Sequence, residues 1–206
     1  MSLTKSRLAI ILSKLRVFDD PKFIDEQYTV DSEIGATILW NAFMSGDIQG
    51  RKIADLGAGT GLLGIGASLL EAKEVFFVER DTNVTPILHA NLQEAAKNMQ
   101  NCITHVLLDD VKNFGQPVDT VIQNPPFGVK KMHADRIFLE KAFEIAHVVY
   151  SFHKSESTDF LKKFAEQHNF SLVSEQKFAF PLKRTMKFHT SRIKCIDVSC
   201  YVFRKK

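Results

Sequence analysis

An unusual run of an amide, two prolines and an aromatic residue, Asn124-Pro125-Pro126-Phe127, follows a short apolar stretch. A turn requires only one proline or glycine, so this combination points to chemistry. The Asn124 side-chain oxygen and the Pro125 carbonyl can both accept hydrogen bonds from one planar amino group. The prolines restrict the backbone and add no donors, and Phe127 offers a face on which a flat base can stack. All four residues are therefore predicted to be catalytic, acting on an aromatic amino nitrogen.

A glycine-rich loop, "ADLGAGTGLLGIG", precedes this segment, at a point where a first strand is expected to meet a first helix. Gly59, Gly61 and Gly64, with Glu79 beyond them, match the fingerprint of dinucleotide-binding proteins. However, Asp55 places a carboxylate at the strand end, which disfavours a pyrophosphate and suits a cation. S-adenosylmethionine carries a sulfonium and an amino group and no phosphate. The loop therefore favours S-adenosylmethionine over a nicotinamide dinucleotide.

Strand-like and helix-like segments alternate along the chain, which predicts an α/β fold. We expect a Rossmann-like, seven-stranded and mostly parallel sheet with an antiparallel C-terminal strand, helices on both faces, and an N-terminal helical addition. Strands are predicted at 52–57, 74–80, 103–108, 118–123, 171–180 and 193–204, and helices at 62–72, 83–99, 134–149 and 155–170. The segment "YSFHKS" (150–155) follows the third of these helices closely. We divide this single domain into a helical extension (1–50), a cofactor-binding and catalytic core (51–180) and a basic C-terminal strand segment (181–206).

The order of five motifs along the chain narrows the choice of protein family. "EQY" (26–28), the glycine loop, "NPPFG", "VYSFHK" and a late "KFH" together resemble an archaeal and eukaryotic methyltransferase-like family. That family makes N6-methyladenine in small-subunit ribosomal RNA. The resemblance spans roughly residues 5 to 204. It implies an RNA adenine-N6 methyltransferase that uses S-adenosyl-L-methionine.

The resemblance also implies a set of cofactor contacts. Gln27 would reach the methionine end of the cofactor, Glu79 would hold the ribose hydroxyls, and Asp110 would hold the adenine amino group. Asp110 has an alternative role as a helix or turn cap, and Val30 stands where the family usually has Thr. The full predicted cofactor set is Gln27, Tyr28, Thr29, Val30, Asp55, Gly57, Gly59, Thr60, Gly61, Leu62, Glu79, Asp110, Val111 and Asn124.

The charge is concentrated at one end of the chain. Residues 181–206 carry eight Lys or Arg against one Asp, whereas the rest of the chain carries 19 basic and 23 acidic residues. This segment is predicted to bind a phosphate backbone, although charges that protect a strand edge would look the same. His153 and Lys154 are expected past the fifth strand, near the substrate, or as a polar pair at its end. The predicted substrate-binding residues are Lys130, Lys131, His153, Lys154, Lys183, Arg184, Lys187 and His189.

Other substrates remain open, because an Asn-Pro-Pro-aromatic motif also occurs in enzymes that methylate a glutamine of release factors or adenine in DNA. A nicotinamide-dependent oxidoreductase, or a nucleotide-binding module without catalysis, is the alternative from another class. We expect neither a separate DNA-recognition domain nor a long N-terminal helical domain, and this expectation favours RNA as the substrate.

The remaining expectations concern metals, location and partners. The three cysteines, Cys102, Cys195 and Cys200, lack metal-site spacing and suit a reducing cytoplasm, and no segment is apolar enough to cross a membrane. The predicted third strand lies in "CITHVLL" (102–108), is apolar, and should form a border of the sheet. The resembled family covers this border with a small zinc-binding activator protein, so we expect a similar partner here.

Overall fold

One seven-stranded sheet forms the centre of the computed structural model, which describes residues 3–17, 30–126, 134–182 and 194–206. The strand order is β3-β2-β1-β4-β5-β7-β6. The strands are β1 (Lys52–Leu56), β2 (Glu74–Glu79), β3 (Ile103–Leu108), β4 (Thr120–Gln123), β5 (Val148–Lys154), β6 (Phe170–Leu182) and β7 (Lys194–Lys205).

The direction of the strands agrees with the predicted fold class. β1 pairs in parallel with β2 and β4, and the parallel pairing continues to β3 and to β5. β7 is antiparallel to both of its neighbours, β5 and β6. The prediction of a mostly parallel, Rossmann-like sheet with an antiparallel C-terminal strand is therefore confirmed.

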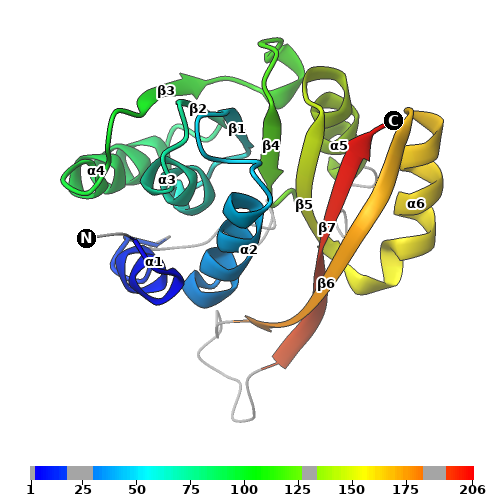
Figure 1. Ribbon diagram of the computed structural model, residues 1–206, viewed down its shortest axis with the longest axis horizontal. Helices are drawn as coiled ribbons and strands as arrows, with labels where there is room; N and C mark the ends of the chain where they lie inside the picture. Colours follow the sequence, from blue (N-terminus) through cyan, green and yellow to red (C-terminus); the bar gives the residue numbers. More distant parts are fainter. Residues whose placement is uncertain (1–2, 18–29, 127–133, 183–193) are drawn as a thin grey trace.

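Helices cover both faces of the sheet, as expected for parallel strands joined by crossovers (Figure 1). One face is covered by α1 (Lys5–Leu12), α2 (Ser32–Met44), α3 (Leu62–Leu69) and α4 (Thr85–Ala96). The other face is covered by α5 (Ala134–Ile145), α6 (Thr158–Gln167) and the short 3-10 helix η2 (Val111–Asn113). A second 3-10 helix, η3 (Ser155–Ser157), joins β5 to α6.

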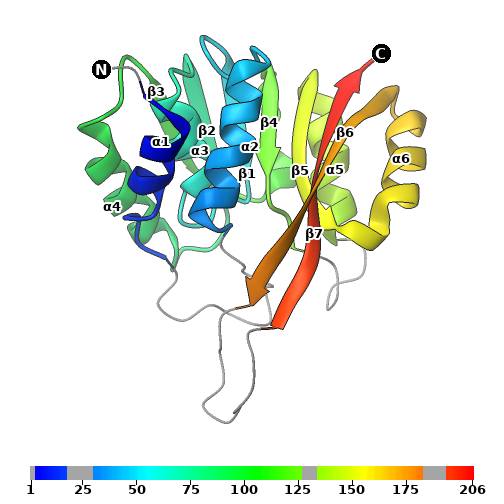
Figure 2. The same cartoon turned by 60° about the horizontal axis from the view of Figure 1, so that its bottom comes forward.

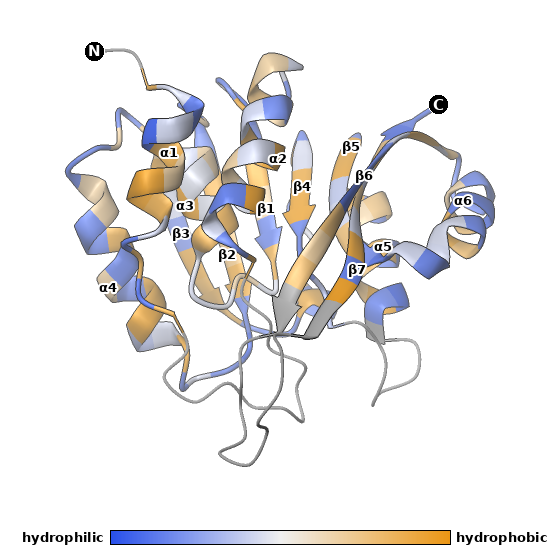
Figure 3. Cartoon of the chain, turned by 90° about the horizontal axis from the view of Figure 1, so that it is seen from below, coloured by the Kyte–Doolittle hydropathy of each residue, from blue (hydrophilic) through white to orange (hydrophobic). Residues whose placement is uncertain are grey.

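Two hydrophobic cores, one on each face, hold the helices to the sheet. Alternate strand residues enter opposite cores: Ile53 lies in the first core and Ala54 in the second. Hydrophilic residues lie mainly on the outward sides of helices such as α6 (Figure 3). Within the described residues, no helix is long and apolar enough to cross a membrane.

The C-terminal hairpin is longer than the central strands. β7 has 12 residues and β5 has seven, and the pair of Lys154 with Val198 leaves the first part of β7 beyond the end of β5. Figure 2 shows β6 and β7 projecting past the ends of β4 and β5. The hairpin therefore rises beside the carboxyl ends of the parallel strands, where open α/β sheets bind their ligands.

Several predicted ends differ from the structure by two or three residues, and the largest difference lies between α5 and β5. The helix expected over 134–149 ends at Ile145, and β5 already begins at Val148. Val148, Val149 and Tyr150 are β-branched or aromatic and pair with β4, so they favour a strand. Apolar residues continue at helix-like spacing across the helix end, from Phe143 through Ile145 and Ala146 to Val149, so the periodicity did not mark the boundary.

Candidate functional site

The glycine-rich loop makes the sharp connection between β1 and α3. Gly57, Gly59 and Gly61 all have positive φ angles, of 70°, 55° and 89°, which favour glycine. A Cβ atom at Gly61 would also lie 2.3 Å from the Leu88 side chain, and one at Gly57 would lie 2.8 Å from the Phe138 ring. Backbone conformation and close packing therefore both require glycine at Gly57 and Gly61.

Asp55 lies under this loop and is almost fully buried, with 2% of its surface exposed. Its carboxylate accepts a hydrogen bond of 2.8 Å from the backbone N–H of Gly64, in the first turn of α3. Burial raises the pKa of Asp55 to about 7, partly offset by the Gly64 hydrogen bond, while the nearby charge of Glu79 raises it further. A cation beside Asp55 would relieve this penalty, which fits a positively charged ligand and not a pyrophosphate.

Glu79, the last residue of β2, connects its strand to the glycine loop. One carboxylate oxygen accepts a hydrogen bond from Gly59 N at 2.8 Å, and the other accepts from the backbone N–H groups of Arg80 and Asp81. The side chain is half-buried. The carboxylate expected to hold a ribose therefore also fixes the conformation of the loop.

Asp110 adopts the alternative role foreseen for it. It caps η2, because its side chain accepts a hydrogen bond from Lys112 N at 3.1 Å, and it forms an ion pair with Arg80 at 3.4 Å. This capping role does not exclude a hydrogen bond between Asp110 and the adenine amine of the cofactor. Val111 packs its side chain into the core under α5, so any contact from this residue would come from its backbone.

The Asn-Pro-Pro segment follows directly on β4. Gln123, the last residue of β4, pairs with Leu56 of β1, so Asn124 and Gly57 are the next residues along two adjacent strands. Asn124 is partly exposed and Pro125 is buried. The candidate catalytic amide and the glycine loop therefore lie at the same edge of the sheet, as the sequence predicted.

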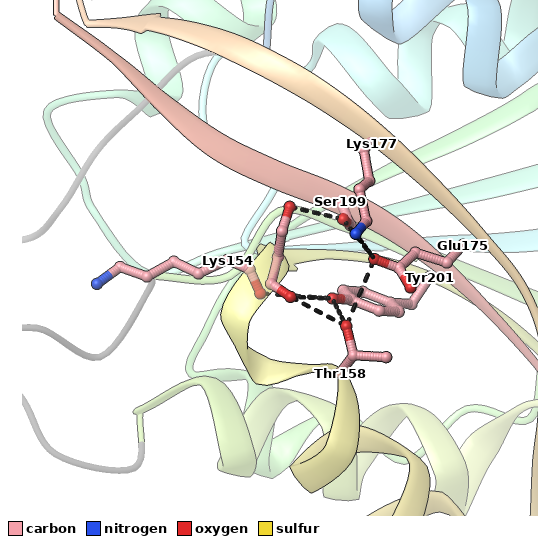
Figure 4. Close-up of polar contacts among 7 residues, drawn as sticks. Lys154, Thr158, Glu175, Lys177, Ser199 and Tyr201 are labelled. Carbon is pink, nitrogen blue, oxygen red and sulfur yellow. Dashed lines mark hydrogen bonds and ion pairs between the residues drawn. The ribbon is translucent and has the colours of Figure 1, made fainter.

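Of the two positions foreseen for His153 and Lys154, the structure has the polar pair at the end of the fifth strand and not a place past it. Both residues belong to β5, and His153 is 2% exposed, so its ring is not available to a substrate at the surface. Lys154 is partly exposed, and its side chain points away from a polar cluster that joins β5, η3 and the hairpin (Figure 4). In that cluster the Tyr201 hydroxyl lies 2.8 Å from Thr158 Oγ1, and Ser199 donates to Glu175 at 2.9 Å.

Sequence reasoning missed Asn91, a buried polar residue of α4. Its amide donates to the Thr60 carbonyl at 2.8 Å and to the Arg16 carbonyl at 3.0 Å, and it accepts from Arg16 N at 2.8 Å. Asn91 thus joins the N-terminal segment to the glycine loop. An amide on the otherwise apolar face of a helix was the signal that could have identified it.

Several predicted residues lie outside the described ones, and their contacts stay predictions. They are Gln27, Tyr28, Thr29, Phe127, Lys130, Lys131, Lys183, Arg184, Lys187 and His189. Val30 and Leu62 are described, and both side chains belong to the first core. Across 3–17, 30–126, 134–182 and 194–206, no group of three or more His, Cys, Asp or Glu is arranged to hold a metal ion.

Comparison with known proteins identifies the family of the chain. The family model for the methyltransferase small domain matches residues 28–150. The zebrafish (Danio rerio) rRNA N(6)-adenosine-methyltransferase METTL5 is 31% identical over 192 residues, covering 91% of each chain. The Drosophila melanogaster protein of the same description is 31% identical and covers 90% of this chain and 89% of its own.

A solved structure extends the similarity to the whole fold. The crystal structure of PH1948 from Pyrococcus horikoshii, provisionally described as an RNA methyltransferase, superposes with a TM-score of 0.88 and 42% identity. The match covers 100% of this chain and 99% of that protein. The chain therefore belongs to the methyltransferase small domain family, alongside relatives named as rRNA N(6)-adenosine-methyltransferases.

Proposed function

We propose that this protein transfers a methyl group from S-adenosyl-L-methionine to the N6 amino group of an adenine in ribosomal RNA, specifically in the small-subunit RNA. The observation that carries the proposal is the placement of Asn124-Pro125-Pro126 at the end of β4, beside the glycine loop that follows β1. The names of the two animal relatives, rRNA N(6)-adenosine-methyltransferases, support adenine in RNA over glutamine or DNA.

The donor groups of the site fit the proposed cofactor, which supplies an electrophilic methyl group. Asp55, the residue before the last of β1, has a buried carboxylate that favours a cation. Glu79 at the end of β2 and Asp110 just after β3 add two further acidic groups. Asp55 would hold an amino group of the cofactor, Glu79 its ribose hydroxyls and Asp110 its adenine amine. The same three groups would repel the phosphates of a dinucleotide.

The role of the Asn-Pro-Pro segment is to orient the amine. The lone pair of an adenine N6 is delocalised into the ring, so the amine is a poor nucleophile. Hydrogen bonds from the amine to the Asn124 oxygen and the Pro125 carbonyl would turn the lone pair toward the methyl carbon. Positioning of this kind accelerates a reaction without a strong general base, because the proton leaves after transfer.

We place the RNA against the C-terminal hairpin. β6 and β7 project past the carboxyl ends of β4 and β5, toward the side where Asn124 lies (Figure 2). The basic residues proposed to contact phosphates, Lys183, Arg184 and Lys187, belong to the segment that joins these two strands. A basic hairpin at the rim of the site would hold the backbone around an extruded base.

We also propose a small zinc-binding activator protein as a partner, and the cytoplasm as the location. β3 is at the border of the sheet and exposes Ile103 and Leu108 by 56% and 54%. An apolar edge strand of this kind favours pairing with an added strand from another protein.

Labelled methyl transfer tests the function directly. The purified protein is incubated with radiolabelled S-adenosylmethionine and ribosomal RNA, and the RNA is digested to nucleosides. We expect the label to elute as N6-methyladenosine, and to be lost with Asn124→Ala. Label in any other nucleoside, or on protein with RNA unlabelled, would overturn the proposed substrate.

A further inference from the structure

A buried polar chain links β4, β5 and α5 behind the candidate catalytic segment. Gln123 Nε2 donates to Ser151 Oγ at 3.0 Å, and Ser151 Oγ lies 2.7 Å from His153 Nε2. The other ring nitrogen, His153 Nδ1, lies 3.8 Å from a carboxylate oxygen of Asp135. Four side chains from three elements are thus joined in sequence, and we call them the β5 polar chain.

The fold explains why these side chains meet. Ser151 and His153 are two residues apart on β5, so both point to the sheet face that α5 covers. Gln123 pairs directly with Ser151 across β4 and β5. Asp135 lies in the first turn of α5, at the same end of the sheet.

The order Ser-His-Asp resembles a hydrolytic triad, but its burial excludes that role. Ser151 has no exposed surface and His153 has 2%, so no substrate can reach the hydroxyl. A nucleophile must meet its substrate within hydrogen-bond reach. The β5 polar chain therefore acts on neighbouring parts of the protein and not on a substrate.

The hydrogen bonds of the β5 polar chain have a consistent direction of proton donation. The Ser151 oxygen accepts from Gln123, so its own proton is available to His153 Nε2. His153 then carries its proton on Nδ1, facing the Asp135 carboxylate. With this tautomer, the two hydrogen bonds each join a donor to an acceptor, and the Nδ1–H group faces the Asp135 carboxylate at 3.8 Å, an electrostatic contact longer than a hydrogen bond.

This arrangement is costly for stability alone. Gln123 is fully buried, and among the described residues no donor reaches its Oε1 atom. A buried acceptor without a partner costs roughly 1–3 kcal/mol, and apolar side chains of similar size would avoid that cost. The benefit of the β5 polar chain must therefore lie in positioning the segments of the protein that it connects.

Those groups flank the candidate catalytic segment. Gln123 immediately precedes Asn124, and Asp135 follows Ala134, the first residue of α5. We propose that His153 is a positioning residue for methyl transfer: through Ser151 and Gln123 it fixes the end of β4, and with it the direction of the Asn124 and Pro125 acceptors. Asp135 orients His153 and fastens α5 to the same point. This inference rests on the proposed function of Asn124.

Two substitutions of His153 test the inference on the full chain, with kcat and cofactor Kd as separate readouts. His153→Phe keeps ring volume but removes both nitrogens, and should lower kcat by roughly tenfold to hundredfold, since misplacements of about 1 Å can cost that much. His153→Gln offers one amide to Ser151 and should recover most of the loss. Cofactor Kd should stay within about threefold in both, because neither nitrogen touches the glycine loop.

Asp135→Asn and Ser151→Ala are milder changes that remain informative if His153→Phe fails to fold. Each should lower kcat, and the double variant Asp135→Asn/Ser151→Ala should be no slower than the worse single variant, because both interrupt one chain. His168→Phe is the matched control. His168 is a half-buried histidine whose ring is tilted against those of Phe164 and Phe143, and its loss should leave kcat unchanged.

The outcomes separate this inference from the proposed function. If wild type forms N6-methyladenosine but Ser151→Ala and Asp135→Asn retain full kcat, the positioning role is wrong and the function stands. Additive losses in the double variant, or a cofactor Kd that weakens in step with kcat, also overturn the positioning role. If wild type forms no N6-methyladenosine, the proposed function itself fails.

Discussion

The carboxylate of Glu79 accepts a hydrogen bond from the backbone N–H of Gly59, 20 residues earlier in the chain, at 2.8 Å. Its second oxygen accepts from two further backbone N–H groups, those of Arg80 and Asp81. One side chain at the end of β2 therefore sets the conformation of the loop after β1. Contacts proposed for a ribose at Glu79 depend on a carboxylate that the protein has already oriented.

Substitutions at Glu79 and Asn124 should separate cofactor binding from chemistry. Glu79→Ala should weaken cofactor binding by roughly 1.5–3 kcal/mol, because a charged hydrogen-bond acceptor is lost. Asn124→Ala should abolish methyl transfer and leave cofactor Kd within a few-fold, because the amide is assigned to the base. Calorimetric titration with the cofactor gives both affinities. Equal losses of affinity in the two variants would contradict these roles.

The raised pKa of Asp55 should make the free energy of unfolding depend on pH. Because the folded pKa of about 7 exceeds the ordinary value of 3.8, the folded state holds a proton that the unfolded state releases. The contribution of Asp55 to the free energy of unfolding should therefore be greatest below pH 4. It should fall by about 4 kcal/mol in total as the pH rises to about 7. Denaturant unfolding of wild type and of Asp55→Asn checks this prediction: the difference between them should grow over this pH range, with Asp55→Asn the more stable at pH 8.

The greater stability of Asp55→Asn should be accompanied by weaker binding of the cofactor. A cationic ligand favours ionised Asp55, so cofactor affinity should increase from pH 6 to pH 8 in wild type, and Asp55→Asn should bind weakly at both. Binding at pH 7 should also release protons, seen as a heat that varies with the buffer. A pH-independent affinity would mean that no cationic group is bound beside Asp55.

The sequence predicted the catalytic edge of the sheet well, because motifs there carry conformational information. Alternating glycines required positive φ angles, and Asn124 followed a strand of recognisable pattern. The partners of these motifs were harder to predict. Asn91 contacts Thr60, Ser151 contacts Gln123, and Asp135 lies beside His153, all distant in the chain. No local pattern indicates which strand or loop each of these side chains meets.

His153 shows why the spacing of residues in the sequence was insufficient to predict the position of every side chain. Its position was expected past the strand because polar residues commonly end strands. Instead β5 continues to Lys154, since β7 pairs with it along its whole length and extends the sheet over it. Only the long-range pairing buries the imidazole, and that pairing cannot be inferred from the neighbours of His153 in the sequence.

Asn91→Ala should affect both stability and cofactor binding. The change removes three hydrogen bonds that join Arg16 and Thr60, and should cost roughly 1–3 kcal/mol in unfolding free energy. Cofactor Kd should rise as well, because the Thr60 carbonyl belongs to the glycine loop. Asn98→Ala, at an exposed position just beyond α4, is the control and should change neither quantity. Unchanged cofactor binding in Asn91→Ala would limit Asn91 to a structural role.

The basic segment should contribute to RNA binding through phosphates. Replacing Lys183, Arg184 and Lys187 with Gln should weaken RNA binding and reduce the dependence of log Kd on log salt concentration, because each phosphate contact releases counterions. Fluorescence anisotropy at several salt concentrations measures this slope. Replacing Lys141, Lys162 and Lys163 of α5 and α6 gives a control of equal charge. An unchanged slope in the first variant would show that its charges serve only solvation.

The border strand β3 should bind the proposed activator by strand addition. Val106 packs against the first core, so a charge there would also disturb the isolated chain. Ile103 and Leu108 are better positions, because both side chains are more than half exposed at the two ends of β3. The double variant Ile103→Glu/Leu108→Glu should lose the partner and keep cofactor Kd unchanged, because the glycine loop lies after β1 and two strands away.

Light scattering on the chain alone examines the same edge without a partner. We expect wild type to self-associate, since an uncovered apolar edge pairs with other copies, and the Ile103→Glu/Leu108→Glu variant to be monodisperse. Val173→Glu is the control: Val173 is 50% exposed on β6, the opposite border of the sheet, and the change should leave self-association as it is. A wild-type chain that is a monodisperse monomer and methylates RNA at full rate alone would rule out an obligatory activator. Self-association that persists in the double variant would place the contact away from β3.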